Sequence, residues 1–599
     1  MHTRKLEMNK RDLCIWLIAC VTVIMFVILG NGIAPFLIDN DNIYLKTVAS
    51  GEMTGEPEPH MYYMGFLSGA FLTALYRITG NGIPWFGLFL CVSMGMPLLL
   101  MLGRMLKTCE KLWTGIAIWL IDILVFFTFF YHYFAKTQYT IATGFVGAAA
   151  LFELALLSVK DETVKTKCWY LVHTLPFLLL SCWAFGMREK GFLMLIPFFG
   201  MVLLGKFFDD LSRTSFLRVI ILGALFGLML LAVFGINRLP YQSDEWREFR
   251  EYTDASEILF DFDGFPDYES HREIYEQMGI TRSSFVAMTQ HYNILLDPAI
   301  NRDNLVELAR IAEAERKQSE PGLLKKLTEV FAVIFRRNLL DYVDRPINVL
   351  VFLLYAFVVL LGILEKKWSV IRDIVFLIIA RMFDWIYLVW YGRYPFRVTQ
   401  IIYMAELVVL ISIILNRELW QWKRGEKERF PKITVHPVFM VLLLAVVLSG
   451  IRFGNPVMKG VRQQISGVRE LSVCISELEQ YLGEHQENFY YFDMSHLYYM
   501  EDTLAWGTSG YENYVYMGSW MPNSPWYQHK LKAHGITDIS GALLEKDNVF
   551  ILYQQVDFDT RDFLDDYFQE HYHGTKIKVV DTFDSSNGFH YEVLKAVRE

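Results

Sequence analysis

Residues 13–33, LCIWLIACVTVIMFVILGNGI, form a run of apolar and small residues without a charged side chain. A helix needs about 20 apolar residues to cross a hydrocarbon core of roughly 30 Å. Similar runs occur at 84–103, 112–133, 138–158, 169–186, 191–206, 217–236, 346–364, 371–391, 398–415 and 435–452. A single run could be a buried core helix, but eleven predict a polytopic α-helical membrane protein. The first run is too long for a signal-peptide core and lacks a small-x-small cleavage site, so we expect an uncleaved span.

The composition supports this class. Of 599 residues, 53% are hydrophobic and 16% aromatic, well above the averages of soluble domains. The formal net charge is -9, which disfavours nucleic acid as a partner because phosphate backbones need a basic surface.

The positive charges predict the topology, because Lys and Arg near helix ends favour the cytoplasmic side. With eleven spans, the segments on the amino-terminal side hold 22 Lys and Arg, against seven in the short segments opposite. This bias would be lost if the apolar stretch 62–78 also crossed the membrane. We therefore expect the amino terminus inside, the carboxyl terminus outside, and 62–78 as a juxtamembrane helix in the first outer loop.

Four regions follow from this topology. Residues 1–236 form an amino-terminal transmembrane core that includes the first outer loop, 34–83. Residues 237–345 form an extracytoplasmic loop subdomain, whose second half has helical patterning, and residues 346–452 form the carboxyl-terminal transmembrane helices. Residues 453–599 alternate strand-like and helical patterns, which predicts an extracytoplasmic soluble α/β domain.

The first outer loop carries the candidate catalytic carboxylates. Asp39 and Asp41 follow the first span directly, and His60 precedes the juxtamembrane stretch. A carboxylate at the membrane surface could deprotonate an acceptor hydroxyl, or hold Mg²⁺ or Mn²⁺ against a phosphate. The alternative is an ordinary solvated acidic loop.

Outward cations are the second candidate group. Arg188 and Lys190 lie in one short connection, and Arg393 and Arg397 lie in another. Cations that oppose the positive-inside trend suggest an anionic ligand, and the guanidinium fork of arginine suits phosphate. The alternative is that they reach lipid headgroups. Gln138, at a further outward turn, and Tyr394, between the arginines, are candidate substrate contacts together with His60.

Two further groups have structural interpretations. Arg381 and Asp384 occur three residues apart inside a predicted span, so we expect them to pair with each other. Asp261, Asp263 and Asp267 alternate with aromatic residues, a composition found on carbohydrate-binding surfaces but equally able to pack a small exported subdomain.

Over about the first 110 residues, the order of parts resembles the polytopic glycosyltransferases of the GT-C class, which includes protein O-mannosyltransferases and lipid A aminoarabinose transferases. The resemblance rests on one span, an acidic outer loop, Pro57, Pro59 and His60 before the juxtamembrane stretch, and residues 75–80, which are similar to the Leu-x-x-Leu-Phe-Gly ending of that helix in the class. A soluble outward domain after the last span is also similar. Residues 237–246 and 261–268 resemble Gram-positive membrane proteins associated with surface-polysaccharide assembly.

The resemblance implies an inverting transfer of a sugar from a polyprenyl-phosphate donor to a glycan, lipid or protein acceptor outside a bacterial plasma membrane. A first-loop aspartate would be the general base, and Arg188, Lys190, Arg393 and Arg397 would bind the donor phosphate. The class has an adjacent acidic pair where this chain has Asp39, Asn40, Asp41 and Asn42, so the choice between Asp39 and Asp41 stays open. The alternatives are a glycolipid flippase or transporter, and a non-catalytic subunit of a polysaccharide assembly machine.

Overall fold

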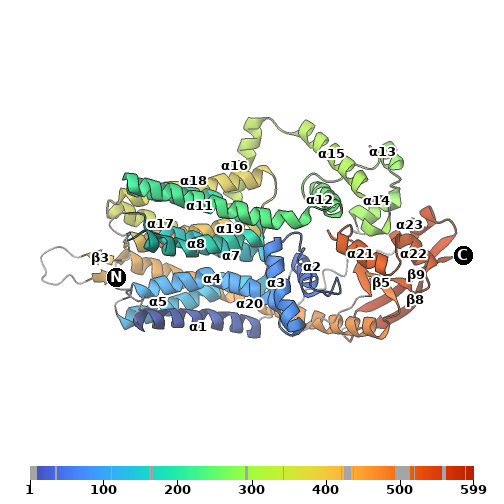
Figure 1. Cartoon of the computed structure of the whole chain (residues 1–599), viewed down its shortest axis with the longest axis horizontal. Coiled ribbons are helices and arrows are strands. Elements are labelled where there is room, and N and C mark those ends of the chain that lie inside the picture. Colours follow the sequence, from blue (N-terminus) through green and yellow to red (C-terminus); the bar gives the residue numbers. More distant parts are fainter. Residues whose placement is uncertain are drawn as a thin grey trace.

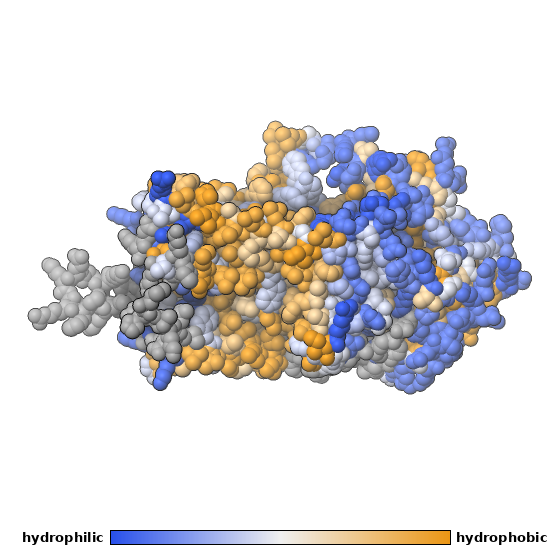
Figure 2. Space-filling view, viewed as in Figure 1, coloured by the Kyte–Doolittle hydropathy of each residue, from blue (hydrophilic) through white to orange (hydrophobic). Residues whose placement is uncertain are grey.

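The structure of this chain is a computed structural model, and it describes residues 10–33, 37–38, 40–109, 111–160, 164, 166–290, 294–341, 343–419, 421–423, 433–435, 437–492, 513–518, 520–555, 562–586 and 588–599. A bundle of long helices fills one half of the molecule, and the 237–345 segment and the tail fill the other (Figure 1). The helix α1 lies within the bundle, whereas the chain ends after β9 in the other half (Figure 1). The bundle carries a broad apolar belt, whereas the other half is hydrophilic (Figure 2).

The bundle helices follow the predicted spans. They are α1 (Lys10–Ile33), α4 (Trp85–Lys107), α5 (Leu112–Val125) with the π-helical turn η2 (Phe126–Phe130) and α6 (Tyr131–Ala135), α7 (Tyr139–Leu156), α8 (Lys167–Met187), α9 (Glu189–Leu193) with α10 (Ile196–Asp209), α11 (Arg213–Arg238), α17 (Ile347–Leu364), α18 (Trp368–Trp390), α19 (Phe396–Asn416) and α20 (Pro437–Glu484).

Ten helical stretches within the described residues are long and apolar enough to cross a membrane, and they coincide with ten of the eleven predicted spans. The remaining predicted span, 371–391, is the helix α18. This helix is absent from the ten, and it carries four ionisable residues, namely Arg372, Asp373, Arg381 and Asp384. The predicted polytopic α-helical fold is confirmed.

The centre of the bundle is α7, which is almost entirely buried and packs against α4, α8 and α19. Glycines allow these close contacts: a Cβ at Gly144 would lie 2.8 Å from Ile401 of α19. At the other end of α7, Glu153 is buried and pairs with Arg104 of α4 at 2.9 Å. The helix is therefore fixed along its length by packing and by one ion pair.

The predicted juxtamembrane stretch contains α3 (Phe66–Thr79), which is 14 residues long. At 1.5 Å per residue it extends about 21 Å, too short to cross the hydrocarbon core. Figure 1 shows α3 lying across the direction of the bundle helices, at the end of the bundle that faces the hydrophilic half of the molecule. The length and direction of α3 agree with the prediction of a juxtamembrane helix.

The pairing predicted inside α18 is wrong. Arg381 forms an ion pair with Glu406 of α19 and a hydrogen bond with Asn338, not with Asp384. Asp384 Oδ2 is buried and has no hydrogen-bond partner among the described residues. The buried Glu406 lies on a neighbouring helix, which spacing within one helix cannot reveal.

The described part of the 237–345 segment contains helices joined by turns and irregular stretches, and no strand. It contains the 3-10 turn η3 (Leu239–Tyr241), α12 (Asp244–Ser256), the π-helical turn η4 (Glu257–Phe262), α13 (Arg272–Gln277), α14 (Arg282–Thr289), the 3-10 turn η5 (Ile294–Leu296), α15 (Arg302–Ser319) and α16 (Leu323–Leu339). The predicted helices in its second half are thus present as α15 and α16.

The tail contains the predicted α/β domain. Its five-stranded sheet has the order β6-β5-β7-β9-β8, from β5 (Phe489–Phe492), β6 (Tyr514–Tyr516), β7 (Val549–Gln554), β8 (Thr575–Asp584) and β9 (His590–Arg598). The pairs β5-β6 and β5-β7 are parallel, and β9 is antiparallel to both neighbours. The helices α21 (Pro525–Ala533), α22 (Ile539–Glu545) and α23 (Asp562–His571) accompany it. The boundary predicted at residue 452 falls inside α20, which continues from the bundle into the tail.

Candidate functional site

The first outer loop is tied to the start of α7. The strand β1 (Leu37–Ile38) pairs in parallel with β2 (Lys136–Thr137). The buried Asn42, in α2 (Asn40–Ser50), donates a hydrogen bond to the Thr137 carbonyl at 3.2 Å and accepts one from the Tyr139 amide at 3.2 Å. Asp41, the neighbour of Asn42, is therefore held beside the first turn of α7. Asp39 lies outside the described residues.

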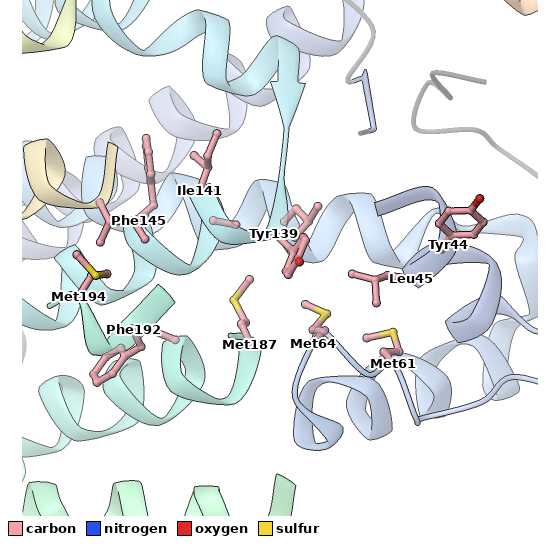
Figure 3. Packing of buried hydrophobic residues seen from close by; sticks show 14 of the residues in the cluster. Tyr44, Leu45, Met61, Met64, Tyr139, Ile141, Phe145, Met187, Phe192 and Met194 are labelled. Carbon is pink, nitrogen blue, oxygen red and sulfur yellow. The ribbon is translucent and has the colours of Figure 1, made fainter. Parts of the chain in front are cut away.

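Three of the predicted site residues converge on Tyr139. The Arg188 guanidinium lies 4.6 Å from the centre of the Tyr139 ring and donates a hydrogen bond to Thr140 Oγ1 at 2.6 Å. The Tyr139 phenol also interacts electrostatically with Asp41 and with Arg397. Figure 3 shows Tyr139 in the buried cluster with Leu45, Met64 and Met187. Segments from four parts of the sequence thus meet at one point.

A tight turn brings the first loop to Arg188. The Gly65 amide donates to the Met187 carbonyl at 3.0 Å, and the Ser68 hydroxyl donates to the Gly186 carbonyl at 2.9 Å. A Cβ at Gly65 would lie 2.2 Å from the Gly186 oxygen, so a larger residue does not fit there. The turn before α3 is therefore locked against the end of α8.

The four predicted phosphate ligands separate into two pairs. Lys190 forms an ion pair with Glu257 at 2.9 Å, and Arg393 forms one with Asp261 at 2.6 Å and lies over the Phe262 ring. Both acids belong to η4. This turn is therefore bonded to two parts of the bundle, α9 and the loop before α19. By contrast, Arg188 has no carboxylate partner within the described ranges, and Arg397 has neither a hydrogen bond nor an ion pair there.

The position of Arg397 is electrostatically unusual. It lies in the first turn of α19, after the N-cap Pro395. The N-terminus of a helix carries a partial positive charge, which favours anions and disfavours a cation. Among the described residues, Arg397 therefore has no hydrogen bond or ion pair that offsets this unfavourable position.

Buried polar atoms without partners occur beside this position. Gln138 caps α7, and its Oε1 accepts hydrogen bonds from the Thr140 and Ile141 amides at 2.9 and 3.2 Å. Its Nε2, however, has no partner among the described residues, and the same is true of Thr137 Oγ1 and Gln400 Nε2. All three side chains are at most 3% exposed. An unpaired buried polar atom costs about 1–3 kcal/mol, so water or a ligand is expected to pair with them.

Two predicted substrate residues lie elsewhere. His60 Nδ1 donates a hydrogen bond to the Glu58 carboxylate, and the His60 ring stacks on Trp246 at 5.2 Å, within an aromatic cluster that includes Phe66 and Tyr241. The guanidinium carbon of Arg337 lies 5.8 Å from the centre of the Tyr394 ring. Within the described part of the chain, neither residue forms a hydrogen bond or a ring contact with Tyr139.

A cavity of about 310 Å³ adjoins the site. Its lining comes from three regions: Tyr62, Tyr63, Met64 and Gly65; Arg188, Glu189 and Lys190; and Asn237, Arg238, Tyr241, Arg250, Thr253, Asp254 and Glu257. Burial, with Glu257 and Asp41 adding to it, raises the pKa of Tyr63 well above its usual value. Partial burial also raises the pKa of Asp254, and nearby Glu257 acts in the same direction.

Tyr63, Asp254 and Glu257 were not predicted from the sequence as site residues. Glu257 is one acid in an acidic, aromatic segment, and its spacing to Lys190 carries no periodic signal. The Tyr62-Tyr63 pair directly before the juxtamembrane helix was a usable signal, since aromatic residues favour the membrane interface.

The predicted metal role of Asp39 and Asp41 stays a prediction. Asp41 belongs to no group of three or more His, Cys, Asp or Glu that could hold a metal ion among the residues described.

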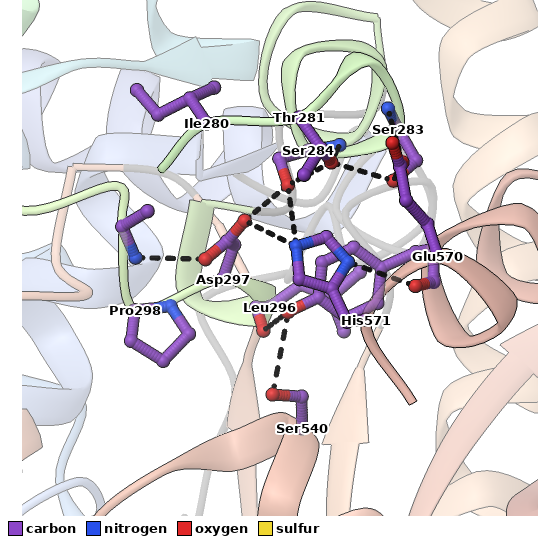
Figure 4. Close-up of polar contacts among 12 residues, drawn as sticks. Ile280, Thr281, Ser283, Ser284, Leu296, Asp297, Pro298, Ser540, Glu570 and His571 are labelled. Carbon is purple, nitrogen blue, oxygen red and sulfur yellow. Dashed lines mark hydrogen bonds and ion pairs between the residues drawn. The ribbon is translucent and has the colours of Figure 1, made fainter. Parts of the chain in front are cut away.

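A Ser, Asp and His cluster joins the 237–345 segment to the tail, but it lacks the arrangement of a nucleophilic triad. Ser284 donates to Asp297 Oδ2, and His571 Nε2 lies 3.4 Å from the same oxygen, while His571 Nδ1 faces the Tyr567 carbonyl (Figure 4). In a triad the histidine would lie between the acid and the hydroxyl. Ser284 is also fully buried. This cluster is an interdomain contact.

No protein-family model matches this chain, and no curated protein matches its sequence. Among solved structures, the chain is similar to "Crystal Structure of ArnT from Cupriavidus metallidurans bound to Undecaprenyl phosphate", with a TM-score of 0.41 and 9% sequence identity. The match covers 96% of this chain and 97% of that one.

Proposed function

We propose that this protein is a membrane glycosyltransferase that takes a sugar from a polyprenyl-phosphate donor, with Arg188 and Arg397 on the donor phosphate and Asp41 as the general base. The observation that carries the proposal is the convergence of Asp41, Arg188 and Arg397 on Tyr139. Two arginines without carboxylate partners in the described chain supply the positive charge that a phosphate needs.

The chemistry follows from these roles. The acceptor hydroxyl oxygen attacks the anomeric carbon of the donor sugar while its proton passes to the Asp41 carboxylate. The bond between that carbon and the phosphate oxygen breaks, and the polyprenyl phosphate leaves with one more negative charge. Arg188 and Arg397 stabilise this developing charge, an effect that is larger in a site that excludes water. Asp39 remains the alternative base.

The cavity beside Arg188 is the place proposed for sugar rings. Tyr62, Tyr63 and Tyr241 offer aromatic surfaces, and Asp254 and Glu257 can accept hydrogen bonds from hydroxyl groups. A cavity with ionisable groups of both signs suits a polyhydroxylated ligand better than a hydrocarbon chain. Gln138 remains a proposed contact to the substrate because its Nε2 lacks a partner in the described chain.

The test uses the full chain in lipid nanodiscs. Binding of undecaprenyl phosphate is measured by native mass spectrometry for the wild type, Arg188→Gln, Arg397→Gln and the matched control Arg393→Gln. We expect a loss of at least tenfold in affinity for the first two variants and a smaller change for the control. Equal retention of undecaprenyl phosphate in all four proteins would contradict the proposed phosphate site.

Covalent transfer separates an enzyme from the alternatives. Incubation with undecaprenyl-phosphate sugars and cell-envelope extract, followed by mass spectrometry of the products, should yield a glycosylated acceptor with the wild type only. Lipid translocated across proteoliposomes without a covalent product would instead favour a flippase. Stable co-purification with other proteins, and full tolerance of Asp39→Asn and Asp41→Asn, would favour a non-catalytic subunit.

A further inference from the structure

The helix α16 has an apolar stripe, formed by Leu324, Phe331, Phe335 and Leu339, that is exposed on the surface of the molecule. Leu324, Phe331, Phe335 and Leu339 are 83%, 49%, 59% and 51% exposed. They occur at spacings of seven, four and four residues, which places them on one side of a helix. Large apolar side chains exposed together are a sign of an interaction surface.

The same helix has two other faces. Val330, Ile334, Arg337 and Asn338 are buried, and α16 packs against α18. Lys325, Glu329 and Arg336 form an exposed charged row directly beside the apolar stripe. A helix with one packed, one apolar and one charged face is suited to the boundary between hydrocarbon and water.

The position of α16 fits such a boundary. Figure 1 shows α16 projecting sideways from the bundle, across the direction of the bundle helices, near the end that meets the soluble half. At this place Figure 2 shows an apolar lobe that extends outward from the apolar belt. With 17 residues and about 25 Å of length, α16 is too short to span a membrane.

We propose that α16 is an in-plane membrane helix, whose apolar stripe inserts into the leaflet at the loop-bearing end of the bundle. The occupant of the exposed surface is therefore the lipid bilayer. Lys326 supports the placement, since its Nζ lies 4.2 Å from the ring centre of Trp390, at the end of α18. Tryptophan at a helix end and a lysine above it are typical of the membrane interface.

The inserted helix connects to the turn that carries Arg397. Its buried Arg337 forms hydrogen bonds with Asp344 at 2.9 and 3.2 Å, and Asp344 accepts a hydrogen bond from Thr399 at 2.7 Å. Thr399 is two residues from Arg397, in the same first turn of α19. The position of α16 is thus coupled, through buried hydrogen bonds, to the turn that carries Arg397, the arginine proposed to bind the donor phosphate.

Site-directed spin labelling of the full chain in nanodiscs of phosphatidylethanolamine and phosphatidylglycerol tests the insertion. Single cysteines are introduced at Leu324, Phe331 and Phe335, with Lys325 and Glu329 as matched positions on the charged row, in a background without reactive native cysteines. We expect the first three labels to be accessible to oxygen and protected from a water-soluble nickel chelate, and the other two to show the reverse.

Two outcomes overturn the inference. Labels at Leu324 and Phe331 that collide freely with the nickel chelate place the stripe in water. Labels inaccessible to both reagents place it against protein, and a doubled particle mass would identify a second copy as that protein. Neither result depends on a bound phosphate, so failure here leaves the proposed transfer activity untouched, and failure of undecaprenyl phosphate to bind leaves the insertion untouched.

A variant measurement addresses the connection to the site. Phe331→Asp should weaken undecaprenyl phosphate binding severalfold while Lys325→Asp, one face away, changes it little. If both variants bind undecaprenyl phosphate as the wild type does while the labels report insertion, the proposed connection through Arg337 is wrong. The in-plane placement of α16 is then retained without that connection.

Discussion

Arg397 and Arg417 lie at the two ends of α19, about 30 Å apart at 1.5 Å per residue. Arg417 follows the last residue of the helix and bonds to Asp209 at 2.8 Å and to Asp373 at 2.9 Å. Arg372 bonds to the same two acids, which closes a network among α10, α18 and α19. Arg397, in the first turn, has neither a hydrogen bond nor an ion pair with the described residues.

The difference separates a structural cation from a candidate ligand-binding one. Arg417 is stabilised in two ways. Its charge is favoured by the partial negative charge of the helix C-terminus, and it forms ion pairs with Asp209 and Asp373. Arg397 lies at the end of the helix that disfavours a cation, without a described counter-ion. An exposed cation at that end would be unremarkable, but Arg397 is partly buried beside Tyr139. The donor phosphate proposed above is the anion that would offset the charge of Arg397.

The largest effect is expected for Asp41→Asn. If Asp41 is the base, this change removes proton transfer and lowers kcat by about 10² to 10⁴-fold. Binding of undecaprenyl phosphate should persist, because the arginines remain. Single-turnover transfer and native mass spectrometry, measured on the same preparation, separate the two effects. Unchanged transfer in Asp41→Asn together with its loss in Asp39→Asn would move the role to Asp39.

Arg397→Gln should cost about 10² to 10³-fold in transfer, the size seen when a group that stabilises transition-state charge is removed. Its thermal stability should stay close to that of the wild type, because no described hydrogen bond or ion pair is lost. Arg393→Gln, on the same connection but paired with Asp261, is the matched control and should lose far less activity. If both substitutions reduce transfer equally, the distinction between the paired and the unpaired arginine fails.

Arg417→Gln should show the reverse pattern. It leaves Asp209 and Asp373 with one cation fewer in a partly buried network, and the expected loss of stability is about 1–3 kcal/mol. Binding of undecaprenyl phosphate by the protein that remains folded should be unchanged. Thermal unfolding in nanodiscs, compared with Arg397→Gln, measures this contrast. A stable Arg417→Gln protein that no longer binds undecaprenyl phosphate would invert the assignment of the two ends.

The comparison also shows how far the sequence could predict this molecule. Apolar run length predicted the bundle helices, and the count of cations predicted that α3 is a juxtamembrane helix. Alternation of apolar and polar residues predicted most of the tail strands. These signals are local, because each depends on residues within one helix or strand.

The site required contacts that local patterns do not contain. The first-loop and arginine candidates came from their position at helix ends, yet Lys190 and Arg393 pair with η4 through residues far along the chain. Arg381 likewise pairs with another helix, not with the nearby Asp384. The packing of separate segments decides which cation has no counter-ion among the described residues. Sequence spacing alone cannot predict that packing.

The smallest effect concerns a paired cation outside the membrane, the imidazolium of His571. The side chains of Asp297, Ser284 and Tyr567 face it, with Glu570 nearby. Although burial opposes charging, the bond to Asp297 raises the pKa of His571 above 6.5, and bonds to His571 and Ser284 lower the pKa of Asp297 below 3.8. The histidine contribution to stability is therefore complete below pH 6.5 and is lost as pH rises through the folded-state pKa. The aspartate contribution is present above pH 3.8 and is lost as pH falls through its folded-state pKa.

The pair should consequently stabilise the contact between α14 and α23 most strongly between about pH 4 and pH 6.5. We expect His571→Gln to lower thermal stability by about 1 kcal/mol or less in this range, and by less once the pH has risen through the folded-state pKa of the wild-type histidine. The control His590→Gln removes a partner of Asp584 in the hairpin of β8 and β9, away from this contact. A His571→Gln deficit that grows with pH would show that the neutral imidazole, not the ion pair, holds the two domains together. Arg417 would then be the better guide to how this chain uses paired charge, because its guanidinium cannot be switched off by pH.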